Sequence, residues 1–223
     1  MRSFLSVPAR LAPSPIASDS LRRLKRRIQA AIGLILRVTL FVVIAVGGGL
    51  FTSWYASTQG LPFTTERSGP WLRWTHSAQL DADPYSTIRN DRLGILPYSS
   101  TFVARYEAST DDAGRRLHSS CHYALQGPLP DATWWRLHVF DQDGRPIDNP
   151  ANRFGFNAAT IIDRPDGTFR IDVAREARPG NWLPVPRGGG LVVVLEILNR
   201  TGAAGALRER TRALPSISRV SCQ

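Results

Sequence analysis

The uncharged stretch VTLFVVIAVGGGLFTSWY, residues 38–55, decides what kind of protein this chain can be. As an α-helix these residues would extend about 27 Å, close to the hydrocarbon thickness of a bilayer. At one end, the long aliphatic part of Arg37 lets its charge reach the headgroups. At the other end, Trp54 and Tyr55 suit a membrane interface. The stretch therefore predicts one transmembrane helix.

Basic residues gather just before this stretch. They are Arg22, Arg23, Lys25, Arg26, Arg27 and Arg37. Residues 1–55 hold eight basic residues and one acidic residue, out of 28 and 18 in the whole chain, so the remainder is nearly balanced. A basic flank stays in the cytoplasm, which predicts a single-pass protein of the inner membrane with its carboxy-terminal domain in the periplasm. Because the excess charge lies at the membrane, we expect no nucleic-acid partner.

A cleaved signal peptide is the alternative interpretation of the apolar stretch. Its n-region would be unusually long, and a cut after Ala56 would leave Trp54 where a small residue is needed. We therefore expect an uncleaved anchor. The expected organisation is a disordered cytoplasmic tail (1–17), a basic juxtamembrane helix (18–37), the span (38–55), an irregular connector (56–82) and a periplasmic domain (83–223).

Alternation of apolar and polar residues dominates the chain beyond residue 100. It is found in residues 101–108, 120–127 and 133–140. Turn sequences DQDG at 141–144 and RPDG at 164–167 separate such stretches, and the apolar run at 191–198 predicts a central strand. Asp83 and Gly94 mark the ends of one short helix. We expect a mostly β fold, an antiparallel β-sandwich of jelly-roll type behind one transmembrane helix and one short helix.

The segment ARPGNWLPVP, residues 177–186, permits two interpretations. In the first it is structural: Trp182 and Leu183 plug one end of the sandwich, while Pro184 and Pro186 prevent ladder pairing. In the second it is the lip of a ligand pocket. The candidate ligand-binding residues are then Arg178, Asn181, Trp182, Trp134, Trp135 and Tyr123. Adjacent tryptophans on a strand point to opposite faces, so one ring of the 134–135 pair is exposed, covered by the connector or held in an interface.

Both cysteines, Cys121 and Cys222, follow the predicted span. An even count in an oxidising compartment favours one disulfide, and two unrelated free thiols are the alternative. The bond would close a loop of about a hundred residues and contribute up to about 4–5 kcal/mol in the chain-entropy model.

The four histidines, His76, His118, His122 and His138, do not predict a metal site. On a strand, His118 and His122 would lie about 13 Å apart, too far for one ion. A His122–His138 pair across neighbouring strands is a weaker alternative. Asp141 and Asp143 have the spacing of calcium-loop ligands, but a hairpin turn explains this spacing better. Since nucleophile, phosphate-loop and CxxC motifs are also missing, the sequence predicts no catalytic residues, no metal and no cofactor.

Several stretches together resemble a bacterial family known as domain of unknown function 1214. They are DADPY (81–85), Leu96-Pro97, C-x-Y-x-x-x-G (121–127), W-x-L-x-V-F-D-x-D-G-R (135–145), NPANRFGF (149–156), DGTFRIDVA (166–174), ARPGNWLPVP (177–186) and LPSISRVSC (214–222). The resemblance covers about residues 60–222 and implies an envelope β-sandwich with both cysteine contexts in the family pattern. One departure is Glu196-Ile197-Leu198, where the family often shows an R-L-Y type ending.

The resemblance implies no established activity, but it suggests a partner. In longer relatives this domain follows another, domain of unknown function 1254, in the same chain. The first functional hypothesis is therefore a membrane-anchored module that docks a separately encoded companion of that kind. The second is a sugar- or lipid-binding protein with a pocket near Trp182. The third is an envelope hydrolase or isomerase that uses scattered Asp and His residues.

Overall fold

The structure, a computed structural model, describes residues 15–75, 78, 82–96, 98–100, 102–186, 189–198 and 213–222, with side chains from residue 21 onward. The chain divides into two compact units, Met1–Trp54 and Tyr55–Gln223, which are described separately. The predicted cytoplasmic tail lies mostly outside the described residues.

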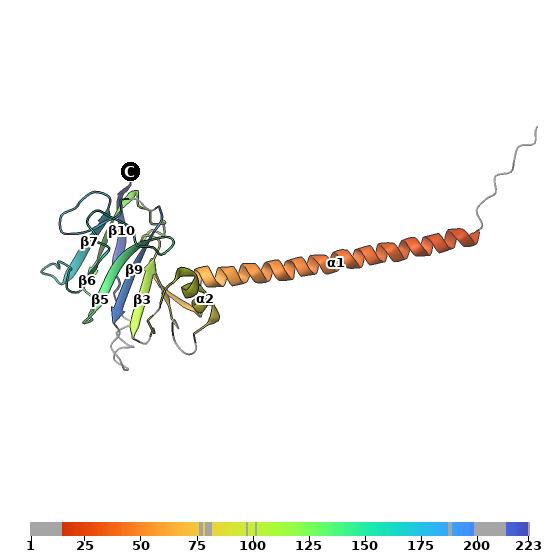
Figure 1. Cartoon of the computed structure of the whole chain (residues 1–223), viewed down its shortest axis with the longest axis horizontal. Helices are drawn as coiled ribbons and strands as arrows, with labels where there is room; N and C mark the ends of the chain where they lie inside the picture. Colours follow the sequence, from red (N-terminus) through yellow and green to blue (C-terminus); the bar gives the residue numbers. More distant parts are fainter. Residues whose placement is uncertain are drawn as a thin grey trace, which may run out of the picture. The chain divides into compact units, whose positions relative to one another are not determined.

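The first helix, α1, runs without interruption from Pro15 to Gln59, so it includes both the predicted basic helix and the predicted span (Figure 1). Its segment Leu21–Gln59 is long and apolar enough to cross a membrane. Apolar side chains along it are exposed, among them Phe41 and Leu50. Thr52, near its end, donates its hydroxyl to the carbonyl of Gly48 at 2.9 Å. A helix of this kind satisfies its polar groups internally, as a bilayer requires.

The second unit is a β-sandwich of two sheets. Within the described residues its strands are β1 (Thr65–Ser68), β2 (Trp71–Trp74), β3 (Val103–Ala108), β4 (Cys121–Pro128), β5 (Trp135–Asp141), β6 (Gly155–Asn157), β7 (Thr168–Ala174), β8 (Asn181–Pro184), β9 (Leu191–Leu198) and β10 (Ser216–Cys222). One sheet has the order β1-β2-β3-β9-β5-β6, and the other β10-β4-β7-β8. The predicted mostly β sandwich is confirmed, and the apolar run 191–198 is a central strand.

Alternate residues of each strand build the core between the sheets. From β9 these are Leu191, Val193, Leu195 and Ile197, and from β7 Phe169, Ile171 and Val173. Trp135 of β5 stacks on Phe169 of β7 with ring centroids 5.8 Å apart, which joins the two sheets. The intervening residues of β3, β9 and β5 therefore form the outer face of the six-stranded sheet.

Two local expectations need correction. Residues 56–82 are not irregular throughout, because β1 and β2 lie there and β2 pairs with β3. Pro184 does not prevent pairing either: residues 181–184 form β8, which runs parallel to β7. Proline is tolerated because β8 is an edge strand, where one side of the backbone needs no ladder partner.

The short helix and the turns agree with the sequence. Helix α2 spans Pro84–Leu93, and the Asp83 carboxylate caps it by accepting from the backbone N–H of Tyr85 and Ser86. Gly94 ends it in the left-handed region, with φ of 61°. In the DQDG turn, Asp141 accepts backbone N–H groups from Asp143 and Arg145. This hydrogen bonding explains Asp141 as a turn residue.

Candidate functional site

The structure does not bring the six sequence-predicted ligand residues together. Tyr123 and Trp135 are only 1% and 2% exposed and belong to the core, so neither offers surface to a ligand. Trp134, the other ring of the pair, is 36% exposed on the outer face of the six-stranded sheet. Its ring lies 5.6 Å from the guanidinium carbon of Arg136.

Asn181 and Trp182 are held by hydrogen bonds within the sandwich. The Asn181 amide accepts from the backbone N–H of Ile162 and donates to the carbonyls of Ile162 and Arg170. The Trp182 indole donates to the carbonyl of Ala174 at 3.0 Å. Asn181 is buried, whereas Trp182 keeps part of its ring at the surface. Asn181 therefore has a structural role that fixes the loop before β7.

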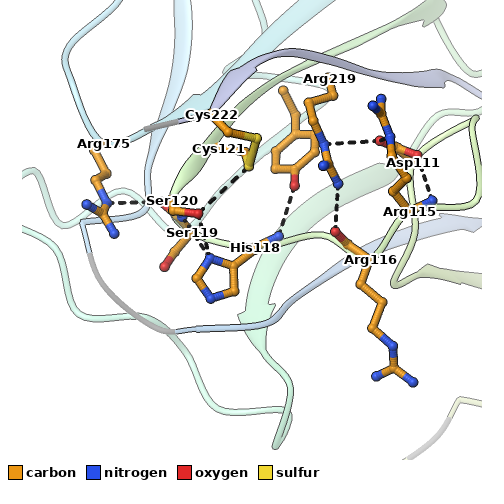
Figure 2. The surroundings of a disulfide bond; sticks show 11 residues. Asp111, Arg115, Arg116, His118, Ser119, Ser120, Cys121, Arg175, Arg219 and Cys222 are labelled. Atoms are coloured by element: carbon orange, nitrogen blue, oxygen red, sulfur yellow. Dashed lines mark hydrogen bonds and ion pairs between the residues drawn. A yellow bond between two sulfur atoms is a disulfide. The ribbon is translucent and has the colours of Figure 1, made fainter.

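Arg178 lines a shallow hollow beside the disulfide, together with Ser120, His122 and Arg175. Cys121 and Cys222 are bonded, as predicted, and the bond ties the end of β10 to the start of β4 (Figure 2). Nearby, His118 Nδ1 lies 2.8 Å from the Ser120 hydroxyl and accepts the Ser120 backbone N–H at 3.1 Å. Because His118 and Ser120 are two residues apart and share a backbone contact, this pair is a contact within the turn that precedes β4.

An ion pair fixes β10 next to the disulfide. Arg219 lies 3.2 Å from the carboxylate of Asp111 (Figure 2). Its guanidinium carbon also lies 5.5 Å from the ring centre of Tyr123. Burial would raise the pKa of Asp111, but hydrogen bonds from the backbone and side chain of Arg115 and the charge of Arg219 lower it. The Asp111 carboxylate is therefore ionised and holds this corner together.

The structure describes three of the four histidines, His118, His122 and His138. His122 lies on β4 and His138 on β5, in different sheets, so the alternative of a pair across neighbouring strands is wrong. His122 Nε2 instead lies 2.8 Å from the carboxylate of Asp172, which also accepts from Arg170. His76 lies outside the described residues. Among the residues that are described, no group of three His, Cys, Asp or Glu side chains is placed to hold a metal ion.

Sequence reasoning missed the most organised polar cluster, which lies on the outer face of the six-stranded sheet. Glu196 of β9 stands between Arg105 of β3 and Arg136 of β5 in register, and its carboxylate accepts from both. Glu107, two residues along β3, accepts from Arg105 at 2.9 Å and from Arg89 of α2. Five charged side chains thus form one continuous chain of ion pairs.

The acids of the cluster are buried. The Glu196 side chain is 4% exposed and that of Glu107 is 11%. Burial would raise the pKa of Glu196, but hydrogen bonds from Arg136 and the charges of Arg105 and Arg136 lower it. Burial likewise opposes the charge on Arg105, yet Glu107 and Glu196 raise its pKa. Both partners stay ionised, so the face carries fixed charges.

His138 borders the cluster as a neutral ring. Burial and the positive charge of Arg136 lower its pKa. Gly155 of β6 makes room for it, because a Cβ there would lie 2.5 Å from the imidazole and 2.4 Å from the Leu137 carbonyl oxygen. Phe140 stacks on it from the same strand, with centroids 6.0 Å apart. The imidazole is thus packed against Phe140 and Gly155 and is partly buried.

A pocket lies where this cluster meets α2, with an empty volume of about 430 Å³ that includes its open mouth. We call it the α2 pocket. Its lining includes Trp74, Arg89, Tyr98, Arg105, Glu107 and Glu196. Trp74 is 7% exposed, and its indole N–H has no hydrogen-bond partner within the described part of the chain. Arg89 lies over its ring, 5.1 Å from the centroid.

The sequence does carry a signal for this cluster. Arg105 and Glu107, and likewise Arg136 and His138, are separated by one residue within strand patterns whose other positions are apolar. Such spacing places the charges on one face, but register between distant strands decides whether they meet. That register comes from tertiary pairing, which the sequence pattern leaves open.

Residues 103–201 match the model of a family described as "Protein of unknown function (DUF1214)". This part of the sandwich is therefore a DUF1214 region. The match begins at β3 and includes β4 through β9, so it contains the buried acids Glu107 and Glu196. It supports the resemblance seen in the sequence, while the family description assigns no activity.

Among curated proteins, none matches the chain. Solved structures that resemble the chain include two from other bacteria. The VPA0106 protein from Vibrio parahaemolyticus is 21% identical, with a TM-score of 0.51 over 63% of this chain and 36% of its own. An uncharacterized protein from Burkholderia cenocepacia is 16% identical, with a TM-score of 0.42 over 77% of this chain and 39% of its own. The first likeness concerns the fold alone, and the chain covers well under half the length of either protein.

Proposed function

We propose that this chain is a single-pass inner-membrane protein whose periplasmic β-sandwich docks a second envelope domain. The long apolar helix supports the anchor, and the basic residues before its apolar part support a cytoplasmic amino terminus. The Cys121–Cys222 bond supports an oxidising compartment for the sandwich. The companion would resemble domain of unknown function 1254.

The observation that carries the docking proposal is the stacked pair Trp134 and Arg136. Both lie on the outer face of the six-stranded sheet, and Glu196 holds the Arg136 guanidinium against movement. Tryptophan and arginine dominate the energetics of protein interfaces. A rigid side chain loses less conformational entropy on association than a mobile one. The pair therefore offers a preorganised anchor for a partner.

Copurification from membranes tests the proposal. The full chain, tagged at the amino terminus, is extracted in mild detergent, and the proteins that copurify are identified. Recovery of a companion domain in near-equal amount supports docking, and Trp134→Ser should reduce that recovery at least tenfold. Ile162→Ser is the matched control, because Ile162 is an exposed apolar residue outside the strands of the six-stranded sheet. A chain that is recovered alone contradicts the proposal.

Topology is tested separately by labelling. A cysteine-specific reagent that cannot cross the inner membrane should label a cysteine placed at Ile162 in intact spheroplasts, and should leave one placed at Ser18 unlabelled. The opposite pattern contradicts the proposed orientation. Labelling of neither site in intact spheroplasts, but of both after lysis, contradicts a periplasmic sandwich.

A further inference from the structure

A polar groove is lined by the last turn of α1, by helix α2 and by the turn that follows β5. Its cavity volume is about 570 Å³, within the range of small-molecule sites. We call it the basic groove, and its lining includes Ser57, Thr58, Arg89, Arg92, Asp143 and Arg145. All of these residues belong to the second unit. The groove is therefore a feature of this unit, with room for a ligand of several heavy atoms.

The backbone around the basic groove is held in place without a ligand. Ala56 and Ser57 are only 2% and 6% exposed, so the last turn of α1 is packed into the second unit. Arg89 of α2 is paired with Glu107, which lies outside the groove lining. The turn after β5 is fixed by hydrogen bonds to the Asp141 carboxylate. A ligand would therefore meet walls that are already formed.

The charges in these walls favour an anion with a single charge. Arg92 and Arg145 have exposed side chains, and in the described part of the chain neither forms an ion pair with a carboxylate. Asp143 is the acid that lines the groove beside them. Because Glu107 neutralises Arg89, the other three charged groups leave one unmatched positive charge. A phosphodiester carries one negative charge, and guanidinium groups bind phosphate oxygens in a bidentate way.

The position of the groove along α1 favours a lipid as the source of this phosphodiester, a step that rests on the membrane anchor proposed above. Trp54 and Tyr55 suit the membrane interface, and α1 continues without a break to Gln59. At a rise of 1.5 Å per residue, Thr58 lies about 4.5 Å beyond Tyr55 along the helix. The headgroup layer on each side of a bilayer is about 5–8 Å thick. In the anchored chain, the α1 wall of the groove therefore lies at the depth of the lipid headgroups.

We propose that the basic groove binds the phosphodiester of an anionic phospholipid in the leaflet next to the sandwich. Arg92 and Arg145 hold the phosphate oxygens, and the amide of Gln142, which also lines the groove, is available to the rest of the headgroup. This binding goes beyond docking, since Trp134 and Arg136 are not part of the groove lining.

Photocrosslinking of the full chain in nanodiscs tests the inference. The nanodiscs consist of phosphatidylcholine with a small fraction of phosphatidylglycerol that carries a photoreactive headgroup, and mass spectrometry identifies the crosslinked peptides. We expect crosslinks at residues 89–93 and 142–145, which unlabelled phosphatidylglycerol reduces at least tenfold. Soluble glycerol phosphate at the same concentration should leave them unchanged. Absence of crosslinks in both segments overturns the inference, and equal competition by glycerol phosphate overturns the assignment to a lipid.

Two double variants locate the binding. Arg92→Gln with Arg145→Gln removes both unmatched guanidinium groups and should lower crosslinking in the groove at least tenfold. Arg116→Gln with Arg164→Gln is the matched control, because it removes the same charge from exposed arginines outside the groove lining. It should leave the crosslinks unchanged. All four side chains are exposed, so both variants should fold, which thermal unfolding checks. Equal crosslinking in the two variants overturns the site.

The basic flank before the apolar stretch separates this inference from the anchor itself. Residues 22–27 should also crosslink to the photoreactive lipid, and neither double variant changes them. Crosslinks at this flank without crosslinks in the groove would overturn the lipid site and leave the anchor intact. Loss of both sets would contradict the anchor, and the lipid site with it.

Discussion

Trp71 and Trp74 project from opposite faces of β2, and within the described part of the chain only Trp71 has an acceptor for its indole N–H. Trp71 is 1% exposed in the core and donates to the Pro215 carbonyl at 2.7 Å. Trp74 lines the α2 pocket, and its buried nitrogen has no acceptor among the described residues. Three positions along a strand thus separate a tryptophan with a satisfied indole N–H from one whose N–H has no acceptor among the described residues.

Phenylalanine at each position should separate these two roles. Both changes remove ring volume, but only Trp71→Phe breaks a hydrogen bond and leaves a buried carbonyl unpaired, which costs about 1–3 kcal/mol in addition. We expect Tm to fall several degrees further for Trp71→Phe than for Trp74→Phe. Thermal unfolding followed by near-ultraviolet circular dichroism measures both. Equal losses would mean that the Trp74 nitrogen is satisfied in solution.

The sequence predicted the strands and the short helix of this fold better than it predicted which strands pair and in which register. Alternation and turn residues located β3, β4, β5, β7 and β9, since these signals are local. The pairing of β8 with β7 was missed because proline normally opposes pairing, and only the edge position of β8 permits it. Glu196 was noted as a departure from the family pattern, but its two arginine partners depend on register between strands distant in sequence.

The candidate site shows the same limit. The sequence suggested a ligand pocket near Trp182 with further aromatic residues in its wall. In the structure, Trp135 and Tyr123 are in the core, and the Asn181 side chain is hydrogen-bonded to the backbone. Hydrophobic patterning cannot separate a core aromatic ring from a ligand platform, because both are large and apolar. The Trp74 indole nitrogen, which has no acceptor among the described residues, is visible in the structure alone.

Glu196→Gln tests whether the ion-pair chain stabilises the sheet. The change leaves Arg105 and Arg136 facing each other without the negative charge between them. Both guanidinium groups are partly exposed, so solvent limits the loss to about 1–3 kcal/mol. Glu176→Gln is the control: its side chain is 65% exposed and lies 3.6 Å from Arg178, a pair expected to contribute less than about 1 kcal/mol. Similar losses in the two variants would contradict a structural role for Glu196.

His138 makes stability depend on pH between 7 and 5. Its pKa is lowered in the folded chain by burial and by the charge of Arg136, with a smaller effect of Arg105, while Glu196 opposes them. The unfolded chain takes up the proton near its ordinary pKa of about 6.5. Above that pH both states are neutral, and His138 adds nothing. Below it the unfolded state binds more proton than the folded state, so stability falls as pH falls, by less than about 1.4 kcal/mol per pH unit because the imidazole is partly exposed to solvent.

The variant His138→Gln should flatten this dependence. Its Tm should fall less than that of the unmodified chain between pH 6.5 and 5, while any difference at pH 8 reports packing alone. The pKa of Glu196 is also lowered, but the stability that follows from it is complete above the ordinary carboxylate pKa of about 4.3 and is lost only at lower pH. Glu196 therefore does not affect the comparison of the two pH profiles above pH 5. Parallel pH profiles for the two proteins would show that the imidazole titrates normally.

The disulfide should stabilise the whole sandwich against unfolding. Locally, we expect that only the last residues of β10 need it to stay paired with β4. It closes a loop with a sequence separation of 101, for which chain entropy predicts up to about 4.7 kcal/mol. Yet Ile217, at the other end of β10, is fully buried, and its backbone N–H donates to the Asp112 carboxylate at 2.8 Å.

In the double variant Cys121→Ser, Cys222→Ser we therefore expect a lower Tm with the fold retained. Hydrogen exchange should rise at residues 219–222 and stay slow at Ile217, because the core contact outlasts the bond. Fast exchange along all of β10 would mean that the disulfide, and not Ile217, holds this strand in the sheet.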